Sequence, residues 1–266
     1  DGSKTGRDVG GSDIFLPLTL GFHVDILSPK IDNSFGHPRR SPIFLDKDDS
    51  VKIEISWTMV ETQLTSFQLF AQDLFITETT SDTLIYTYKP SESDSGFIGF
   101  KALITDTSGL IDSSAFEVLI KPSITESTLP EELQAGINYI NGNTATLVLY
   151  APYKEFVYVI GDFNDWMVDP EYQMNKYTAN EDSVYWWLPL DNLTPETEYA
   201  FQYFVDGEIR VADPYTHKVL DRWNDQYIDE TIYPDLKPYP FGKTDHACSV
   251  LETNQTPYEW QMDDFV

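Results

Sequence analysis

Several residue types that common functions require are scarce in this sequence. Among 266 residues there is one cysteine, Cys248, which excludes an internal disulfide and a metal site built on cysteine ligands. Lys and Arg number 17 against 44 Asp and Glu, so the formal net charge is −27. A surface this acidic repels phosphate backbones and anionic lipids, and we therefore expect no nucleic acid partner.

Long apolar runs and catalytic signatures are missing as well. No run approaches the about 20 apolar residues that a membrane-spanning helix needs, so no transmembrane segment is expected. The four histidines are scattered without the spacing of metal ligands. No G-x-S-x-G, P-loop or H-E-x-x-H pattern occurs. We expect no metal, no cofactor and no catalytic residue in this chain.

What the sequence does have is a regular succession of short apolar segments separated by turn residues. From Thr19 onward these segments recur about every 8–12 residues. In VKIEISW, residues 51–57, apolar and polar side chains alternate strictly, which is the pattern of a half-buried strand. About seven such segments within about 100 residues predict an immunoglobulin-like sandwich. No segment has the pattern of an amphipathic helix of three or more turns.

The segment KPSITESTLPEELQAG interrupts this pattern, and a second series of β segments follows it. After Tyr215 the periodicity fades into a stretch rich in Pro, Tyr and Asp. The sequence therefore predicts an all-β protein of two tandem immunoglobulin-like β-sandwich domains followed by an irregular tail. The expected ranges are a flexible leader at 1–12, an immunoglobulin-like β-sandwich at 13–122, a linker at 123–133, a second β-sandwich at 134–228 and an extended tail at 229–266.

Three short motifs occur in order in the second domain: GDFNDW at 161–166, FVDGE at 204–208 and ADPY at 212–215. With TATLVLYAP before them, they resemble the N-terminal sandwich of family-13 glycoside hydrolases, the group of α-amylases, pullulanases and branching enzymes. That module is classed as carbohydrate-binding module family 48 and is similar to the glycogen-binding domain of AMP-activated protein kinase. The resemblance covers about residues 134–228.

This resemblance implies a non-catalytic N-terminal region of a secreted α-amylase-family glycoside hydrolase, which binds or orients α-glucan chains such as starch or glycogen. Its partners would be the glucan and the enzyme's own downstream catalytic barrel, toward which the tail at 229–266 would lead. A (β/α)₈ barrel needs about 250 residues, and two sandwiches leave no room for it, so we expect this chain not to be an enzyme by itself. The expected location is extracytoplasmic, reached through an upstream signal.

Side-chain alternation sorts the aromatic residues of the second domain into inward and outward sets. In SVYWWLPL, Trp186 shares a face with the leucines and points inward, so Tyr185 and Trp187 point outward. Aromatic rings pack on the C–H faces of a pyranose, and amides bind its hydroxyls. Tyr185 and Trp187 beside Gln202 therefore predict a platform on which a sugar stacks.

The resemblance adds further candidate binding residues. Trp166 stands where the sugar-binding members have one of their two stacking tryptophans, although a residue that caps the core fits this position equally well. Gln202 replaces a sugar-contacting lysine and Ile209 replaces the second tryptophan, while Trp223 and Asn224 lie near a stretch that supplies an asparagine contact. Two alternatives stay open: structural spacer domains that bind no sugar, and an adhesin of tandem immunoglobulin-like domains. Joint exposure of the aromatic candidates would favour binding, and burial of all of them would favour the spacer.

Overall fold

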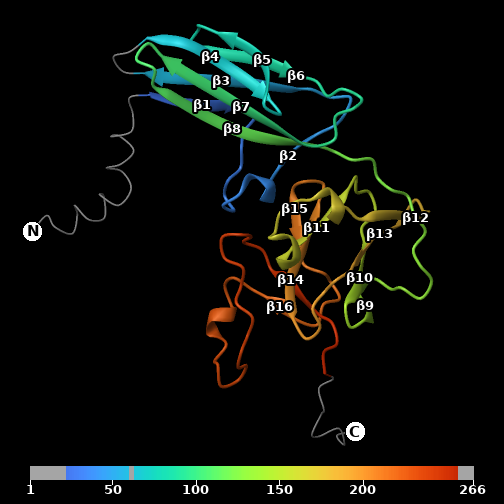
Figure 1. Cartoon of the computed structure of the whole chain (residues 1–266). Coiled ribbons are helices and arrows are strands. Elements are labelled where there is room, and N and C mark those ends of the chain that lie inside the picture. The colour runs from blue at the N-terminus through green and yellow to red at the C-terminus, as the bar shows by residue number, and fades with distance from the viewer. Residues whose placement is uncertain (1–21, 60–62, 257–266) are drawn as a thin grey trace, which may run out of the picture. The chain divides into compact units, whose positions relative to one another are not determined.

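The chain folds into two compact units built almost entirely from β-strands (Figure 1). The computed structural model describes residues 22–59 and 63–256, so the expected leader at 1–12 lies outside the described residues. Unit 1 comprises the described residues up to Asp32 together with Pro42–Pro122. Unit 2 comprises Asn33–Ser41 and the chain from Ser123 onward.

Helical structure in the described residues is limited to 3₁₀ turns of three residues each. None of these turns has the length or the apolar character to cross a membrane. They are η1 Pro38–Arg40, η2 Asp162–Asn164, η3 Pro170–Tyr172 and η4 Asp225–Tyr227.

Unit 1 is a β-sandwich of a three-stranded and a five-stranded sheet. The strand orders are β1-β3-β6 and β2-β8-β7-β4-β5. β2 runs parallel to β8, and the other pairs are antiparallel. The bounds are β1 Phe22–Ser28, β2 Ile43–Leu45, β3 Val51–Met59, β4 Leu64–Ala71, β5 Leu74–Thr79, β6 Thr83–Tyr88, β7 Gly96–Asp106 and β8 Ile111–Ile120.

The period-two pattern decides which side chains reach the core of unit 1. Ile53 and Ile55 of β3 are fully buried, as the alternation in VKIEISW predicts. They belong to one apolar cluster with Phe67 and Leu69 of β4 and Phe100 of β7. The two sheets bury these faces against each other, which confirms the predicted all-β, immunoglobulin-like sandwich.

Unit 2 is also a β-sandwich, with a four-stranded sheet in the order β12-β13-β10-β9 and a five-stranded sheet in the order β11-β14-β17-β16. The fifth strand of the latter, β15, pairs with β14. The bounds are β9 Gly136–Asn141, β10 Thr144–Tyr150, β11 Val157–Gly161, β12 Asn175–Asn180, β13 Ser183–Leu190, β14 Glu198–Val205, β15 Ile209–Val211, β16 Val219–Leu220 and β17 Cys248–Glu252.

The expected irregular tail at 229–266 is wrong for its described part, because it contains a strand of the second sandwich. β17 pairs with the central strand β14 in an antiparallel register that sets Tyr199 opposite Leu251. Both Leu251 and Cys248 are fully buried. Without β17, β14 would lose a backbone partner in the middle of the sheet. The second sandwich therefore extends to residue 252 instead of ending at 228.

A segment from the expected range of the first sandwich also belongs to unit 2. Residues 33–41, between β1 and β2, pack there through backbone and side-chain contacts. The Arg210 guanidinium of β15 lies 4.5 Å from the ring centroid of Phe35 and 4.7 Å from that of Phe204. Arg40 forms an ion pair with Asp165 at 2.9 Å. These contacts join positions far apart in the chain, so local sequence patterns do not reveal them.

Candidate functional site

The GDFNDW motif forms the turn that ends β11, and the fold accounts for its glycine. A Cβ atom on Gly161 would lie 2.5 Å from the carbonyl oxygen of Ala200 on the paired strand β14. Only glycine allows the two backbones to approach this closely. The Asn164 side chain then closes the turn, because its Oδ1 accepts from the Gly161 N–H at 2.9 Å and its Nδ2 donates to the Val159 carbonyl at 2.9 Å.

The same motif places Trp166 in the core of unit 2, so the prediction that its ring stacks on a sugar is wrong. The indole is 0% exposed, and its Nε1–H donates to Asp162 Oδ1 at 2.9 Å. Asp162 Oδ2 accepts from the Ala200 N–H at 2.9 Å and pairs with Lys237 at 2.9 Å. Asp162 and Trp166 thus tie the turn to β14 and to the later chain, which corresponds to the core-capping alternative.

Gln202 is equally unsuited to contact a ligand. It lies on β14 and points away from Phe201 and the core between the sheets, but residues 244–247 cover it completely. Its Nε2 donates to the carbonyls of Ala247 at 2.8 Å and His246 at 3.1 Å, and its Oε1 accepts from Thr244 Oγ1 at 3.0 Å. The prediction that this amide binds sugar hydroxyls is therefore wrong, because the side chain is fully buried and bonded to the chain itself.

Trp223 and Asn224 lie together on the loop that follows β16. Trp223 is 65% exposed, and the Arg222 guanidinium lies 5.0 Å from its ring centroid. The Asn224 Nδ2 donates to Asp221 Oδ1 at 2.9 Å. β16 belongs to the five-stranded sheet and Tyr185 to the four-stranded sheet, and no hydrogen bond or ring contact in the described part of the chain joins Trp223 or Asn224 to Tyr185.

Tyr185 and Trp187 of β13 face away from the core, which confirms the predicted alternation. Their neighbours Val184, Trp186 and Leu188 are buried in the apolar cluster between the sheets. Both outward rings are partly exposed. The Trp187 Nε1–H donates to the carbonyl of Ser127 at 3.2 Å, and residues 125–127 of the expected linker bond to Lys176 along the edge of β12.

A row of three tyrosines crosses this outer face at one level of the sheet. Tyr150 of β10 and Tyr177 of β12 each lie directly opposite Tyr185 of the central strand β13. The ring centroids of Tyr150 and Tyr185 are 5.4 Å apart, and those of Tyr177 and Tyr185 are 6.5 Å apart. Tyr150 is 47% exposed. The strand register therefore assembles the row: Tyr177 and Tyr185 meet across the β12–β13 hairpin, and Tyr150 joins them from a strand much earlier in the chain.

Tyr153 extends the row beyond the end of β10. It is 73% exposed and its hydroxyl donates to the Asp182 carboxylate. The Tyr150 hydroxyl donates to the Asp182 carbonyl at 2.7 Å, so the turn between β12 and β13 holds both rings. The hydrogen bond to Asp182 raises the pKa of Tyr153. We call Tyr150, Tyr153, Tyr177 and Tyr185 the tyrosine face.

Sequence reasoning found Tyr185 but missed the other members of the tyrosine face. Tyr150 carries a signal, because it follows Leu147 and Leu149 of TATLVLY and must point to the opposite side of the strand. Tyr177 and Tyr153 carry none, since only strand pairing and the turn bring them beside it. Aromatic rings that carry a hydroxyl group can pack on the C–H face of a polyol and bond to its hydroxyls.

Comparison with known proteins gives only distant structural likeness. No protein-family profile and no curated protein sequence matches the chain. A structure of the fibronectin(III)-like modules of CbhA from Clostridium thermocellum is 12% identical with a TM-score of 0.33, and the match covers 71% of this chain and 90% of that one.

Two further matches come from larger proteins. One is SGBP-B of the Bacteroides ovatus mixed-linkage glucan utilization locus, in complex with a mixed-linkage heptasaccharide. It is 14% identical with a TM-score of 0.28, and the match covers 71% of this chain and 45% of that one. The Group B Streptococcus pullulanase SAP is 15% identical with a TM-score of 0.25, at 70% and 24% coverage. The chain thus spans less than half the length of these two proteins, and at such values the likeness does not extend to function.

Proposed function

We propose that unit 2 binds a neutral glucan chain on the tyrosine face. The observation that carries this proposal is the row of Tyr150, Tyr185 and Tyr177 on the outward side of the four-stranded sheet, where the core of the sandwich does not need them. Large exposed aromatic rings that gather on one face of a soluble domain are typical of a binding surface.

The size and charge of the face favour an extended, uncharged ligand. Three adjacent strands place the outer members of the row about 10 Å apart, which is the scale of a short oligosaccharide. With a formal net charge of −27, the chain disfavours anionic polysaccharides. The four phenols supply rings for stacking together with hydroxyls that donate and accept hydrogen bonds.

The resemblance of the GDFNDW, FVDGE and ADPY motifs to family-13 glycoside hydrolases narrows the proposal. We propose an α-1,4-linked glucan as the ligand and an accessory role beside a catalytic barrel of the same extracytoplasmic enzyme. In this role the chain binds and orients the substrate, and the cleavage takes place in the barrel. The two sandwiches contribute binding surface and no catalytic group.

A structural spacer is the second candidate function, and a specific observation favours it. Trp166 and Gln202, two residues that the resemblance assigns to sugar contact, are fully buried in their own fold. A spacer requires only that the sandwiches be rigid, and under that function the tyrosine face would bind no sugar. Direct binding measurements separate the two functions.

Isothermal titration calorimetry of the full chain with maltoheptaose and with amylose tests the proposal. Tyr185→Ala and Tyr177→Ala each remove one ring of the row, and we expect each to weaken binding by about 1 kcal/mol, or roughly fivefold in Kd. Phe75→Ala removes an aromatic ring that is 54% exposed in unit 1 and is the matched control, with no expected change.

Cellohexaose and polygalacturonate extend the test to linkage and charge. We expect weaker binding of the β-linked chain and none of the anionic chain. If wild-type protein releases no heat with any glucan, the binding proposal fails and the spacer function stands. Cleavage of maltoheptaose by the purified chain would contradict the accessory role.

A further inference from the structure

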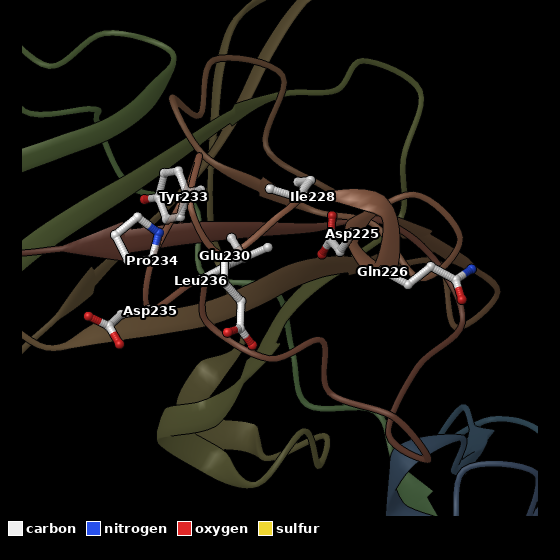
Figure 2. Close-up of a pocket in the computed structure, with 8 residues that line it drawn as sticks. All are labelled: Asp225, Gln226, Ile228, Glu230, Tyr233, Pro234, Asp235 and Leu236. Atoms are coloured by element: carbon white, nitrogen blue, oxygen red, sulfur yellow. The ribbon is translucent and has the colours of Figure 1, made fainter.

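Unit 2 contains a pocket on the loop between β16 and β17, apart from the tyrosine face (Figure 2). Its volume is about 560 Å³, and its lining residues are Asp225, Gln226, Ile228, Glu230, Tyr233, Pro234, Asp235 and Leu236. This volume lies within the range of about 300–1,000 Å³ that is usual for pockets that bind small ligands. Because β16 and β17 belong to the five-stranded sheet, the pocket and the tyrosine face lie on different sheets of the sandwich.

One wall of the pocket is an aromatic ring that the surrounding structure holds in place. Figure 2 shows Tyr233 beside Pro234 along this wall. The Tyr233 hydroxyl accepts from Lys218 Nζ at 2.9 Å, and that ammonium lies 4.7 Å from the ring centroid. Lys218 in turn pairs with Glu198 of β14 at 2.5 Å. The ring orientation is therefore anchored to the central strand of the sheet.

The loop around the pocket is organised by its own side chains. Asp221 Oδ1 accepts from the N–H groups of Trp223 at 2.8 Å and Asn224 at 2.9 Å. Asp229 Oδ1 accepts from the N–H of Thr231 at 2.8 Å and from its hydroxyl at 2.6 Å. These bonds lower the pKa of both aspartates and fix the chain just before the lining segment and in its middle. A ligand thus meets a formed pocket, which reduces the entropy lost on binding.

The polar groups of the pocket are acceptors for hydroxyl donors. Asp225, Glu230 and Asp235 contribute carboxylates, and Gln226 contributes an amide whose Nε2 is already bonded to the Trp223 carbonyl at 2.8 Å. Among the described residues, no three His, Cys, Asp or Glu side chains lie close enough together to hold a metal ion. The carboxylates are therefore spread around the wall, an arrangement that suits several hydroxyls better than one cation.

We infer that this pocket is a second saccharide site, which takes the end of a neutral sugar chain. A terminal sugar would place its C–H face against Tyr233 and donate its hydroxyls to Glu230, Asp235 and Asp225. The tyrosine face runs across three adjacent strands and would bind the side of a longer chain, whereas the pocket would hold a chain end. The inference shares with the proposed function only the class of ligand.

The double variant Glu230→Gln, Asp235→Asn tests the pocket without disturbing the fold, because neither carboxylate has a partner among the described residues. We expect maltotriose to bind this variant at least about tenfold more weakly, because two charged acceptors are lost. The affinity of amylose for the tyrosine face should stay unchanged. Glu208→Gln, which neutralises an exposed carboxylate on the β14–β15 hairpin, is the matched control and should behave as wild type.

Calorimetric stoichiometry separates this inference from the proposed function. Maltoheptaose should occupy two sites on the wild-type chain. Tyr185→Ala should weaken one of them about fivefold and leave the other unchanged, whereas the double variant should weaken only the other, at least about tenfold. If the double variant keeps the wild-type affinity for maltotriose, the pocket is not a saccharide site, while the tyrosine face is untouched. If the double variant loses all binding of maltoheptaose while Tyr185→Ala binds it like the wild type, the pocket is supported and the tyrosine face is refuted. Calcium binding that the double variant abolishes, with no binding of maltotriose, would overturn the assignment of a sugar.

Discussion

Trp166 provides the sharpest test of whether the GDFNDW motif serves the fold or the ligand. Its indole is 0% exposed in unit 2, and its N–H donates to the Asp162 carboxylate at 2.9 Å. Trp166→Ala removes the whole ring, and Trp166→Phe removes only the N–H and the second ring. If the residue is structural, both variants lower stability and leave the intrinsic glucan affinity of the folded protein unchanged.

The expected magnitudes follow from burial and hydrogen bonding. Truncation of a buried tryptophan to alanine costs about 3–5 kcal/mol. In a domain of about 150 residues, each kcal/mol corresponds to about 2–4 °C, so Trp166→Ala should lower Tm by roughly 6–20 °C. Trp166→Phe leaves Asp162 without one of its donors and should cost about 1–3 kcal/mol, or roughly 2–12 °C.

Thermal unfolding followed by near-ultraviolet circular dichroism measures the stability, and calorimetry at a temperature well below both transitions measures the affinity. Tyr185→Ala serves as the opposite case: it should weaken glucan binding and change Tm little, because its ring faces outward. A Trp166→Phe protein that keeps the wild-type Tm but loses glucan affinity would refute this reasoning, and it would return Trp166 to the binding site.

Three further predictions concern the packing and electrostatics of unit 2. Gly161→Ala should cost about 3 kcal/mol in urea unfolding, because its Cβ would lie 2.5 Å from the Ala200 carbonyl; an unchanged midpoint would contradict the close strand approach. The Lys243 ammonium is bonded to Asp165 at 2.7 Å and lowers the pKa of that carboxyl in the folded protein. The pair therefore adds to the free energy of unfolding above about pH 4, and this contribution disappears as the pH falls through the lower pKa of the folded state. Asp165→Asn should therefore be less stable than wild type by up to about 1 kcal/mol at pH 6 and equally stable near pH 2, as acid titrations of both proteins would reveal. Arg210→Ala should cost about 2–4 kcal/mol in thermal unfolding, because it removes two ring contacts and the hydrogen bonds of the guanidinium. Arg210→Lys should restore little of this stability, since an ammonium lacks the planar set of N–H donors of a guanidinium.

Short-range patterns in the sequence predicted the fold class well. The alternation that buries Ile53 and Ile55 in unit 1 also buries Trp186 in unit 2 and turns Tyr185 and Trp187 outward. Each of these outcomes depends on a period of two along a single strand, which is a local property of the chain.

Two of the failures have a related cause, which is that the segment that covers a strand or pairs with it can lie far away in the sequence. Alternation correctly turned Gln202 away from the core, but residues 244–247 return to cover it. The strand Cys248–Glu252 was taken for tail because its partner β14 lies about fifty residues earlier and its flanks are rich in proline and tyrosine. A local pattern carries no information about which later segment will pair with an exposed edge.

The amino-acid sequence by itself determined that the chain is an acidic all-β protein, since apolar side chains at every second position can be buried only by stacking one sheet on another. It also determined which way the side chains of each strand point. Only the tertiary structure decided which outward residues remain in solvent: it buried Gln202 under a returning segment and aligned Tyr150, Tyr177 and Tyr185 in one row. The physical reason is that strand register and coverage are set by contacts between residues far apart in the chain, whereas the direction of a side chain is set by its own backbone.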